Sequence, residues 1–590
     1  MSEPVEPIDP TIRTRAMAAA RGTEPFDLLI VGGTVVDVST GELRPADVGL
    51  VGPLIASVHA PGSRGDALDS VDATGRFVAP GFIDMHVHTE SSMLTPGGFA
   101  EAVCPRGTTT VFCDPHELAN VAGVDGVRYL TEASRGLPVR FIVQVPSCVP
   151  PIPGLELSGA DLYAAEVRDM LSWTEVGGLA EVMDMRGVLT GDERMVEVVR
   201  AGLESGKLVS GHAAGLTGPD LQAYLDAGIL SDHEIFTDGD VMEKIRAGMT
   251  VEFRGMIDAL IPPAVEHLNA LPLFPINLVA STDDLFALTL LTDGGIDHLL
   301  RRLIAAGLDP VRAIRMATLH AAYRLARTDL GHVAAGRRAD LVILSDLATI
   351  AVDDVYANGR HVASRGLMLE PVVEGPSSPP YDTMKLTAVA PDDFVLRLDV
   401  PDGRHRVRTV AGAVITEWGE TTVEVRDGVV EIPADHVLQV AIHRHGRAPA
   451  TPVAALLADY GSWTGAIATT VAHDTHNLVV FGRDPDDMAL AARTVIGSGG
   501  GICVVAQGQV TGLIELPIAG LLSPLPAAEV ASAQKRTQDA ALAIGLEAPT
   551  LTQPLFQVLL SSLACLGGPH VTDVGLVDGT SGQIVPSMVL

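Results

Sequence analysis

Histidine and carboxylate side chains recur along the chain in a pattern typical of divalent metal ligands. In chain order, the candidates are His86, His88, Glu181, His212, His233 and the neighbouring pair Asp283 and Asp284. Imidazole and carboxylate groups suit Zn²⁺, Mn²⁺ or Fe²⁺ rather than soft metals. Six ligands are too many for one tetrahedral ion and suit two ions that share a carboxylate and a water. The pattern therefore predicts a binuclear metal centre.

A folded domain must bring these side chains together, and the segment from Pro80 to about Leu330 has a sequence pattern that suits one. Short apolar runs alternate there with helical stretches, which is typical of a parallel sheet. The predicted strands are Phe82–His88, Thr108–Cys113, Arg140–Val145, Gly178–Val182, Leu208–His212, Ile229–His233, Thr250–Phe253 and Ile276–Ser281. Eight such units in about 250 residues match the size of a (β/α)₈ barrel. We therefore predict an α/β protein with a TIM-like barrel.

The candidate ligands lie where the active face of such a barrel is expected, at the carboxyl ends of its strands. The first strand ends in His86-Val87-His88. Positions i and i+2 of a strand share a face, so both histidines point the same way. The other candidates end the fourth, fifth and sixth strands or follow the eighth. Six candidate ligands in this order are a strong signal, whereas each residue alone is a weak one.

The flanking segments predict two further domains. Residues 26–79 and 331–368 both contain short β-rich runs separated by turns, so we expect them to form one composite β-sandwich beside the barrel at 80–330. A linker rich in Pro and Ser follows at Glu370–Asp382. Residues 383–590 then have the length of another α/β domain.

Composition narrows the classes of partner. The 590 residues include 40 basic and 73 acidic side chains, for a net charge of −33. Binding along a nucleic-acid backbone needs Lys and Arg to displace counterions, so we expect no nucleic-acid partner. The charge also disfavours anionic membrane surfaces, and no apolar run of about 18 residues predicts a membrane span. A small neutral substrate in a closed pocket would not feel the net charge strongly.

The cysteines and the first residues favour a cytoplasmic location. Five cysteines occur at long spacings without a C-x-x-C motif, so neither a disulfide framework nor a cysteine zinc site is expected. Met1–Pro10 is acidic and lacks the basic and apolar regions of a signal peptide.

Several sequence blocks resemble the adenine deaminase family of the amidohydrolase superfamily. They include PGFIDMHVHTESSM at 80–93, TTTVFCDPHELAN at 108–120, SDHE at 231–234 and STDD at 281–284. The resemblance extends over about residues 28–525 and implies a binuclear centre, with Mn²⁺ or Fe²⁺ favoured and Zn²⁺ as the alternative. The implied ligands are His86, His88, Glu181, His212, His233 and Asp283, with Asp283 preferred to Asp284 on the family pattern.

The same resemblance implies hydrolysis of adenine to hypoxanthine and ammonia by a metal-activated hydroxide that attacks C6. We expect Asp283 to accept the water proton and pass it to the leaving ammonia, with His116 and Glu117 as further catalytic candidates. The expected purine-binding residues are Glu90, His116, Glu117, His473 and Asn477. The family also implies a homo-oligomer, with a dimer expected.

Structural roles compete for each of these purine-site candidates. Glu90 is also suited to capping the segment after it, and Glu117 to the first turn of a helix, where the dipole favours a carboxylate. His116 is suited to orienting a ligand from behind. The loop from His473 to Asn477 either closes the barrel mouth or forms a turn within its own sheet.

Two other functions compete with adenine deamination. The same metal chemistry suits another aminated base or a cyclic or exocyclic amide, because the pocket rather than the metals selects the substrate. A metal-binding protein without turnover is disfavoured, since all six ligands are present. A cytidine-deaminase zinc site is excluded because no P-C-x-x-C follows His88-Thr89-Glu90. His320 departs from the Asn that is common in the family, and we expect it to pack or cap a helix.

Overall fold

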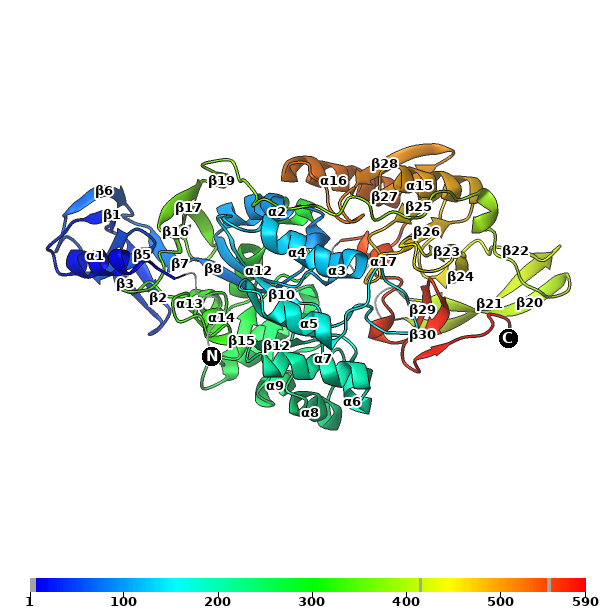
Figure 1. Ribbon diagram of the computed structural model, residues 1–590, viewed down its shortest axis with the longest axis horizontal. Helices are drawn as coiled ribbons and strands as arrows, with labels where there is room; N and C mark the ends of the chain where they lie inside the picture. The colour runs from blue at the N-terminus through cyan, green and yellow to red at the C-terminus, as the bar shows by residue number, and fades with distance from the viewer. Residues whose placement is uncertain (1–6, 413–415, 549–552) are drawn as a thin grey trace.

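The computed structural model describes residues 7–412, 416–548 and 553–590. The molecule is elongated, with a small β region at one end, a barrel in the middle and a C-terminal β-rich region at the other end (Figure 1). Within the described ranges, no helix has the length and apolar character needed to cross a membrane.

Eight parallel strands form the central barrel and confirm the predicted α/β fold class. They are β8 (Phe82–Val87), β9 (Thr108–Cys113), β10 (Arg140–Val145), β11 (Val176–Val182), β12 (Leu208–Gly211), β13 (Ser231–Asp232), β14 (Thr250–Phe253) and β15 (Leu278–Ala280). The first five strands form one ladder and the last three another. At one seam, the Asp283 amide donates to the His86 carbonyl at 2.9 Å. At the other, the Gly211 amide donates to Ser231 Oγ at 3.3 Å.

The outer layer of the barrel consists of helices that follow the strands. They are α2 (Pro96–Val103), α3 (His116–Ala122), α4 (Val124–Ala133), α5 (Ala164–Leu171), α6 (Met185–Thr190), α7 (Glu193–Glu204), α8 (Gly218–Asp226), α9 (Asp238–Arg246), α10 (Ile261–Ala270), α11 (Ala287–Thr292), α12 (Ile296–Ala305), α13 (Pro310–Met316) and α14 (Leu319–Arg324). Asp184, Asp192 and Asp309 begin α6, α7 and α13 by accepting hydrogen bonds from free backbone amides. Such caps fix where each of these helices begins.

The sixth barrel strand is shorter than predicted. The sequence predicts Ile229–His233, whereas β13 contains only Ser231–Asp232. The Asp232 side chain accepts from the Ala213 amide at 2.6 Å, in place of a backbone partner on that side. The ladder therefore stops before His233, and the His233 side chain remains buried at the strand end.

The N-terminal β region is built from both flanks of the barrel segment. Helix α1 (Pro10–Ala20) packs beside a sheet ordered β5-β4-β1-β6, and a second sheet is ordered β19-β18-β17-β16-β7-β2-β3. Their strands are β1 (Phe26–Val31), β2 (Thr34–Asp37), β3 (Glu42–Pro45), β4 (Asp47–Val51), β5 (Leu54–His59), β6 (Ala67–Asp72), β7 (Phe77–Pro80), β16 (Leu341–Asp346), β17 (Ala351–Ala357), β18 (Arg360–Ser364) and β19 (Leu367–Met368). Strand β7 pairs antiparallel with β16. The domain boundaries drawn from the sequence remain a prediction.

The C-terminal region is centred on a nine-stranded sheet ordered β22-β21-β20-β24-β23-β26-β25-β27-β28, with a three-stranded sheet beside it. Its strands are β20 (Gly403–Ala411), β21 (Glu417–Arg426), β22 (Val429–Glu431), β23 (Val437–Ile442), β24 (Val453–Ala458), β25 (Gly465–Thr469), β26 (Leu478–Gly482), β27 (Gly501–Ala506), β28 (Gln509–Glu515), β29 (Pro569–Thr572), β30 (Gly575–Asp578) and β31 (Gln583–Ile584). The helices are α15 (Pro485–Gly497), α16 (Ala527–Ala543) and α17 (Phe556–Leu559).

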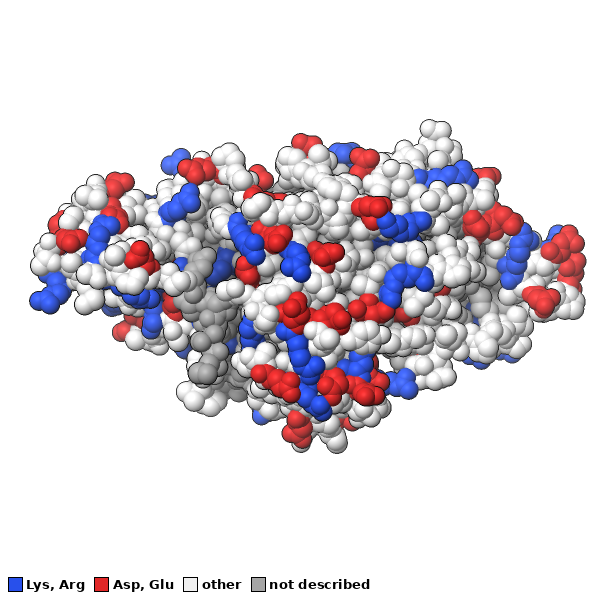
Figure 2. Space-filling model, viewed as in Figure 1, with Lys and Arg blue, Asp and Glu red and all other residues white. Residues whose placement is uncertain are grey.

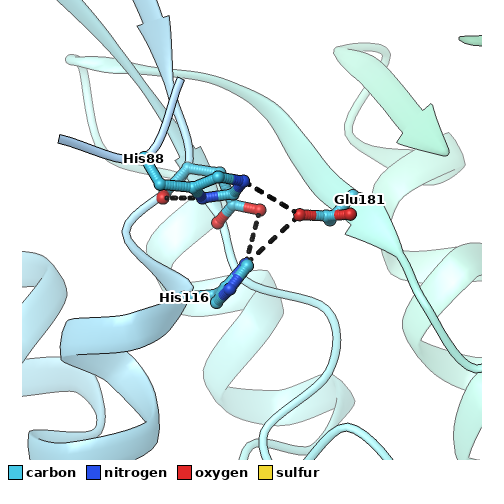
Figure 3. A group of neighbouring side chains, drawn as sticks. His88, His116 and Glu181 are labelled. Atoms are coloured by element: carbon cyan, nitrogen blue, oxygen red, sulfur yellow. Dashed lines mark hydrogen bonds and ion pairs between the residues drawn. The ribbon is translucent and has the colours of Figure 1, made fainter. Parts of the chain in front are cut away.

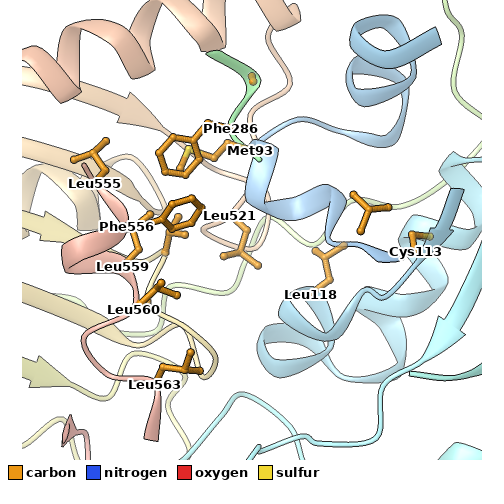
Figure 4. Packing of buried hydrophobic residues seen from close by; sticks show 14 of the residues in the cluster. Met93, Cys113, Leu118, Phe286, Leu521, Leu555, Phe556, Leu559, Leu560 and Leu563 are labelled. Atoms are coloured by element: carbon orange, nitrogen blue, oxygen red, sulfur yellow. The ribbon is translucent and has the colours of Figure 1, made fainter. Parts of the chain in front are cut away.

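An apolar contact joins this region to the barrel mouth. The rings of Phe286, which precedes α11, and Phe556 of α17 have centroids 4.6 Å apart (Figure 4). Gln553 Oε1 accepts from the Phe286 amide at 3.0 Å. On the first strand's side, the Ser523 amide donates to the Met93 carbonyl at 2.9 Å. The C-terminal region therefore covers loops that follow the first and the last barrel strands.

The surface seen in Figure 2 has no continuous basic face, because acidic and basic side chains are interspersed on it. Acidic side chains gather over the barrel helices at the bottom of this view. This distribution agrees with the composition, because 73 acidic side chains outnumber 40 basic ones.

Candidate active site

Glu181, at the end of β11, lies at the centre of the histidine cluster. Its Oε1 is 3.2 Å from His88 Nε2 and 3.7 Å from His86 Nε2. Its Oε2 is 2.6 Å from His212 Nδ1 and 3.3 Å from His233 Nε2. Figure 3 shows His88 pointing at this carboxylate. The two oxygens of one side chain thus face two separate pairs of imidazoles, which is the arrangement of a carboxylate that bridges two sites.

Asp283 faces the first of these pairs from the eighth strand. Its Oδ1 lies 3.3 Å from His88 Nε2 and 3.5 Å from His86 Nε2. Its backbone has a φ of 58°, which turns the chain sharply after β15. The next residue, Asp284, instead contacts the Ser91 hydroxyl. The geometry therefore brings Asp283, rather than Asp284, to the histidine cluster.

The nitrogens and carboxylate oxygens that face one another in the cluster fit divalent cations. His86 Nε2 and His88 Nε2 are 3.0 Å apart and both face carboxylate oxygens. His212 Nε2 is buried without a hydrogen-bond partner among the described residues. Nitrogen lone pairs that converge on carboxylates favour a shared cation. Four imidazoles and two carboxylates are also a donor set that suits borderline divalent metals.

The two carboxylates of the cluster remain ionised in this setting. Burial would raise the pKa of Glu181, but His233 and hydrogen bonds from His116 and His212 hold that pKa well below its usual range. Burial likewise opposes ionisation of Asp283, but Arg254 and two histidines hold its pKa well below the usual value. Both groups are therefore in the charged form that a metal requires.

His116, at the start of α3, belongs to the edge of this cluster. Its Nδ1 is 3.2 Å from Asp114 Oδ2 and 3.4 Å from Glu181 Oε1 (Figure 3). Its Nε2 is 3.7 Å from Asp474 Oδ1 of the C-terminal region. The contacts place His116 between the central carboxylate and the covering loop.

Two buried glutamates lie beside the histidine cluster and form an acidic pair. Burial and the neighbouring Glu117 raise the pKa of Glu90 to about 8. Glu90 Oε1 accepts from the Leu118 amide at 3.3 Å, and Glu117 Oε1 accepts from Ser91 Oγ at 2.7 Å. Glu117 Oε2 is buried and accepts no hydrogen bond from the described residues. This oxygen is therefore able to accept a hydrogen bond from a ligand.

The loop from His473 to Asn477 reaches the barrel and is not confined to its own sheet. His476 Nε2 lies 3.7 Å from Glu117 Oε2, and His473 Nδ1 lies 3.3 Å from Asp474 Oδ1. Burial would lower the pKa of His473, but the charges of Glu117 and Asp474 raise it to about 9. Asn477 differs from its neighbours, because its amide donates to the Leu157 carbonyl at 2.8 Å and accepts from the Arg444 amide at 3.1 Å. These contacts hold the loop in place.

Sequence reasoning missed four residues of the site: Glu234, Arg254, Asp474 and His476. Arg254 follows β14 directly, so its position at a strand end was a usable signal. Its Nη2 is 2.8 Å from Glu234 Oε2, and its Nη1 forms an ion pair with Asp283. Asp474 and His476 belong to the loop that was singled out, but only the fold shows that they face the barrel.

Family models match two parts of the chain. The amidohydrolase family model matches residues 77–362, and the adenine deaminase C-terminal domain model matches residues 413–583. Adenine deaminase from Klebsiella pneumoniae strain 342 is 51% identical and covers 98% of this chain and 96% of its own length. Adenine deaminase 2 from Rhizobium meliloti is 49% identical over 100% of this chain and 99% of its own length.

Among solved structures, N-acetyl-D-glucosamine-6-phosphate deacetylase from Mycobacterium smegmatis is similar, with a TM-score of 0.44 and 21% identity. The match covers 57% of this chain and 100% of that chain.

Proposed function

Since the chain belongs to the adenine deaminase family, we propose that its barrel holds a pair of divalent metal ions through His86, His88, Glu181, His212, His233 and Asp283. The protein is an enzyme that hydrolyses adenine to hypoxanthine and ammonia. The observation that carries the proposed ligand set is the position of Glu181: its two carboxylate oxygens face different pairs of histidines. The proposed metals are Mn²⁺ or Fe²⁺, with Zn²⁺ as the alternative.

A divalent metal ion supplies a Lewis acid that makes water nucleophilic near neutral pH. The protein's own contribution begins with Asp283, whose low pKa keeps it deprotonated and able to accept a proton. We propose that Asp283 takes the proton of the attacking water and delivers it to the amino group that leaves C6. Its burial supports this role, because a dry site keeps the proton from exchanging with bulk water.

We further propose that Glu117, Glu90 and His473 bind the purine. Adenine presents ring nitrogens and N–H groups along its edge, and Glu117 Oε2 is a buried acceptor without a protein donor. Glu90, with a pKa of about 8, carries a proton at neutral pH and is a donor. His473 is protonated there because its pKa is about 9, and it offers a second donor. Glu117 is the proposed carrier of the ring-nitrogen proton.

His116 is proposed to orient Glu181 and to transmit the position of the covering loop, since it contacts both Glu181 and Asp474. Asn477 is proposed to shape that loop, because its amide group contacts Leu157 and Arg444. A homodimer and a cytoplasmic location complete the proposal. Five buried cysteines without a disulfide support the location, since disulfides persist in oxidising compartments.

Metal-free enzyme reconstituted separately with Mn²⁺, Fe²⁺ and Zn²⁺ tests this assignment. Ammonia release from adenine is measured against a panel of other aminated bases and cyclic amides. We expect Mn²⁺ or Fe²⁺ to restore the highest activity, with adenine as the preferred substrate. Equal activity without any metal would refute the metal centre, and a preferred cyclic amide would refute the assigned purine pocket.

A further inference from the structure

Arg254 is a largely buried cation that directly follows the seventh barrel strand, the neighbour of the eighth strand that leads to Asp283. Its side chain is 12% exposed and lies between two carboxylates. Nη2 is 2.8 Å from Glu234 Oε2, and Nη1 forms an ion pair with Asp283 Oδ2. Both terminal nitrogens are therefore occupied by protein groups. A residue engaged in this way acts on the reaction through its partners rather than through the substrate.

The contact with Asp283 is selective for one oxygen. Oδ1 faces the His86 and His88 nitrogens at 3.5 and 3.3 Å, whereas Oδ2 faces Arg254. Rotation of the carboxyl group would exchange these environments, and the guanidinium opposes that rotation. We propose that Arg254 is a positioning residue that fixes the carboxylate of Asp283 toward the histidine pair, with Glu234 anchoring the guanidinium. The inference rests on the proposed role of Asp283.

The anchor itself is held by a second buried cation. Lys244 Nζ donates to the Glu234 carbonyl at 2.8 Å and lies 2.6 Å from Asp232 Oδ2. Asp232 Oδ1 accepts from the Glu234 amide at 3.1 Å. The backbone that carries Glu234 is thus fixed on both sides, from β13 and from α9. A rigid anchor keeps the guanidinium in place against Asp283.

Arginine suits this place better than lysine. A guanidinium is planar and presents donors in a fixed fork, so one side chain contacts two carboxylates at once. A lysine ammonium is a single charged point on a flexible stem and holds both partners less firmly. Loss of the charge would also leave Asp283 and Glu234 buried without their shared partner, which is costly. Glu234→Gln is a gentler change, since the amide keeps the shape and an acceptor.

The test compares Arg254→Gln, Arg254→Lys and Glu234→Gln with the unmodified full-length enzyme. Mn²⁺ affinity is measured by titrating metal-free protein, and kcat and KM for adenine are measured at saturating Mn²⁺. We expect Arg254→Gln to weaken Mn²⁺ binding by about tenfold and to lower kcat by about 10- to 100-fold, as for other residues that orient metal ligands. KM stays within about threefold. Arg254→Lys recovers part of both losses, and Glu234→Gln shows a smaller loss of the same kind.

Arg301→Gln is the matched control, because Arg301 pairs with the buried Asp297 at 2.7 Å within the outer helix α12. It should leave Mn²⁺ affinity and kcat unchanged. Unaltered Mn²⁺ affinity and kcat in Arg254→Gln would overturn the inference, as would a rise confined to KM, which would indicate a substrate contact. If Arg254→Gln does not fold, Glu234→Gln decides by the same criteria.

Asp283→Asn separates this inference from the proposed function. Full activity in Asp283→Asn would refute the role of Asp283 itself, whatever Arg254 does. If Asp283→Asn is inactive and Arg254→Gln is normal, only the positioning role fails. In the Asp283→Asn background, the positioning role predicts no additional loss of Mn²⁺ affinity from Arg254→Gln, because the two changes act on one interaction.

Discussion

Asp474 Oδ1 lies 3.7 Å from His116 Nε2, and this contact joins the C-terminal region to the histidine cluster of the barrel. Burial would raise the pKa of Asp474, but His116 and His473 hold it well below its usual range. A buried carboxylate stays charged only where cationic neighbours offset the free energy lost on removing it from water. The C-terminal region therefore contributes a charged side chain to the edge of the histidine cluster.

Asp474→Asn should lower kcat by about tenfold, because His116 loses the charge that orients it beside Glu181. Steady-state kinetics at saturating metal measure the effect. Asp435→Asn is the control: Asp435 also contacts an adjacent histidine, His436 at 2.8 Å, but is exposed and remote from the barrel mouth. Equal kinetics of the two variants would contradict the role assigned to Asp474.

Glu117→Gln should lower kcat/KM for adenine by at least about 100-fold, because the amide cannot carry the ring-nitrogen proton. Metal content should stay unchanged, since Glu117 contacts Ser91 and His476 rather than the proposed ligands. Glu101→Gln on α2 is exposed and provides the control. A Glu117→Gln enzyme with near-normal kcat/KM would exclude the carboxylate from proton transfer.

Local patterns predict the barrel and the convergence of the candidate side chains. Buried parallel strands are short apolar runs, and β9, β10 and β14 have the predicted ends. The spacing of His86 and His88 determines their common face without any tertiary information. The positions of the candidates at strand ends also predict that their side chains lie close together. The distances around Glu181 agree with such a single cluster.

Contacts across the chain are the part that local patterns do not contain. The His473–Asn477 loop reads equally well as a turn, and only the packing of the C-terminal region brings Asp474 to His116. Arg254 follows a strand end, but the role of its side chain depends on contacts with Glu234 and Asp283, which lie 20 and 29 residues away in the sequence. Such ion pairs have no sequence period, so periodicity cannot reveal them.

Phe556→Ala should destabilise the protein by about 3–5 kcal/mol, since it leaves a cavity where the ring packs on Phe286. It should also lower kcat, because the covering loops lose their apolar support beside Asp284. Phe394→Ala, at a buried site of the C-terminal region against α15, should cost similar stability and leave kcat unchanged. Thermal unfolding and kinetics on both variants separate the two effects; normal kcat in Phe556→Ala would contradict the coupling.

The buried ring of His320 should make the stability of the protein depend on pH. Its ring is buried and Nδ1 donates to the Leu278 carbonyl at 3.0 Å, so the expected packing role has a partner on β15. Burial lowers its pKa from 6.5 to about 4. Between pH 6.5 and pH 4, the unfolded state binds this proton more readily than the folded state does. The contribution of the neutral ring to the free energy of unfolding is therefore fully present above about pH 6.5 and is lost as the pH falls toward 4.

His320→Asn removes this titration. Chemical unfolding at about pH 7.5 and about pH 5.5 should show that the unmodified protein loses about 1.3 kcal/mol more than the variant over that interval. An identical pH dependence of the two proteins would show that His320 is not held neutral by burial.

The number of metal ions bound per chain tests the central claim most directly. Elemental analysis of the Mn²⁺-reconstituted enzyme should give about two ions per chain, and Glu181→Gln should hold no more than one and release almost no ammonia from adenine. Glu175→Gln, at a partly exposed carboxylate just before β11 that pairs with Arg135, serves as the control and should retain both ions. Two ions and full activity in Glu181→Gln would contradict the bridging role on which the account rests.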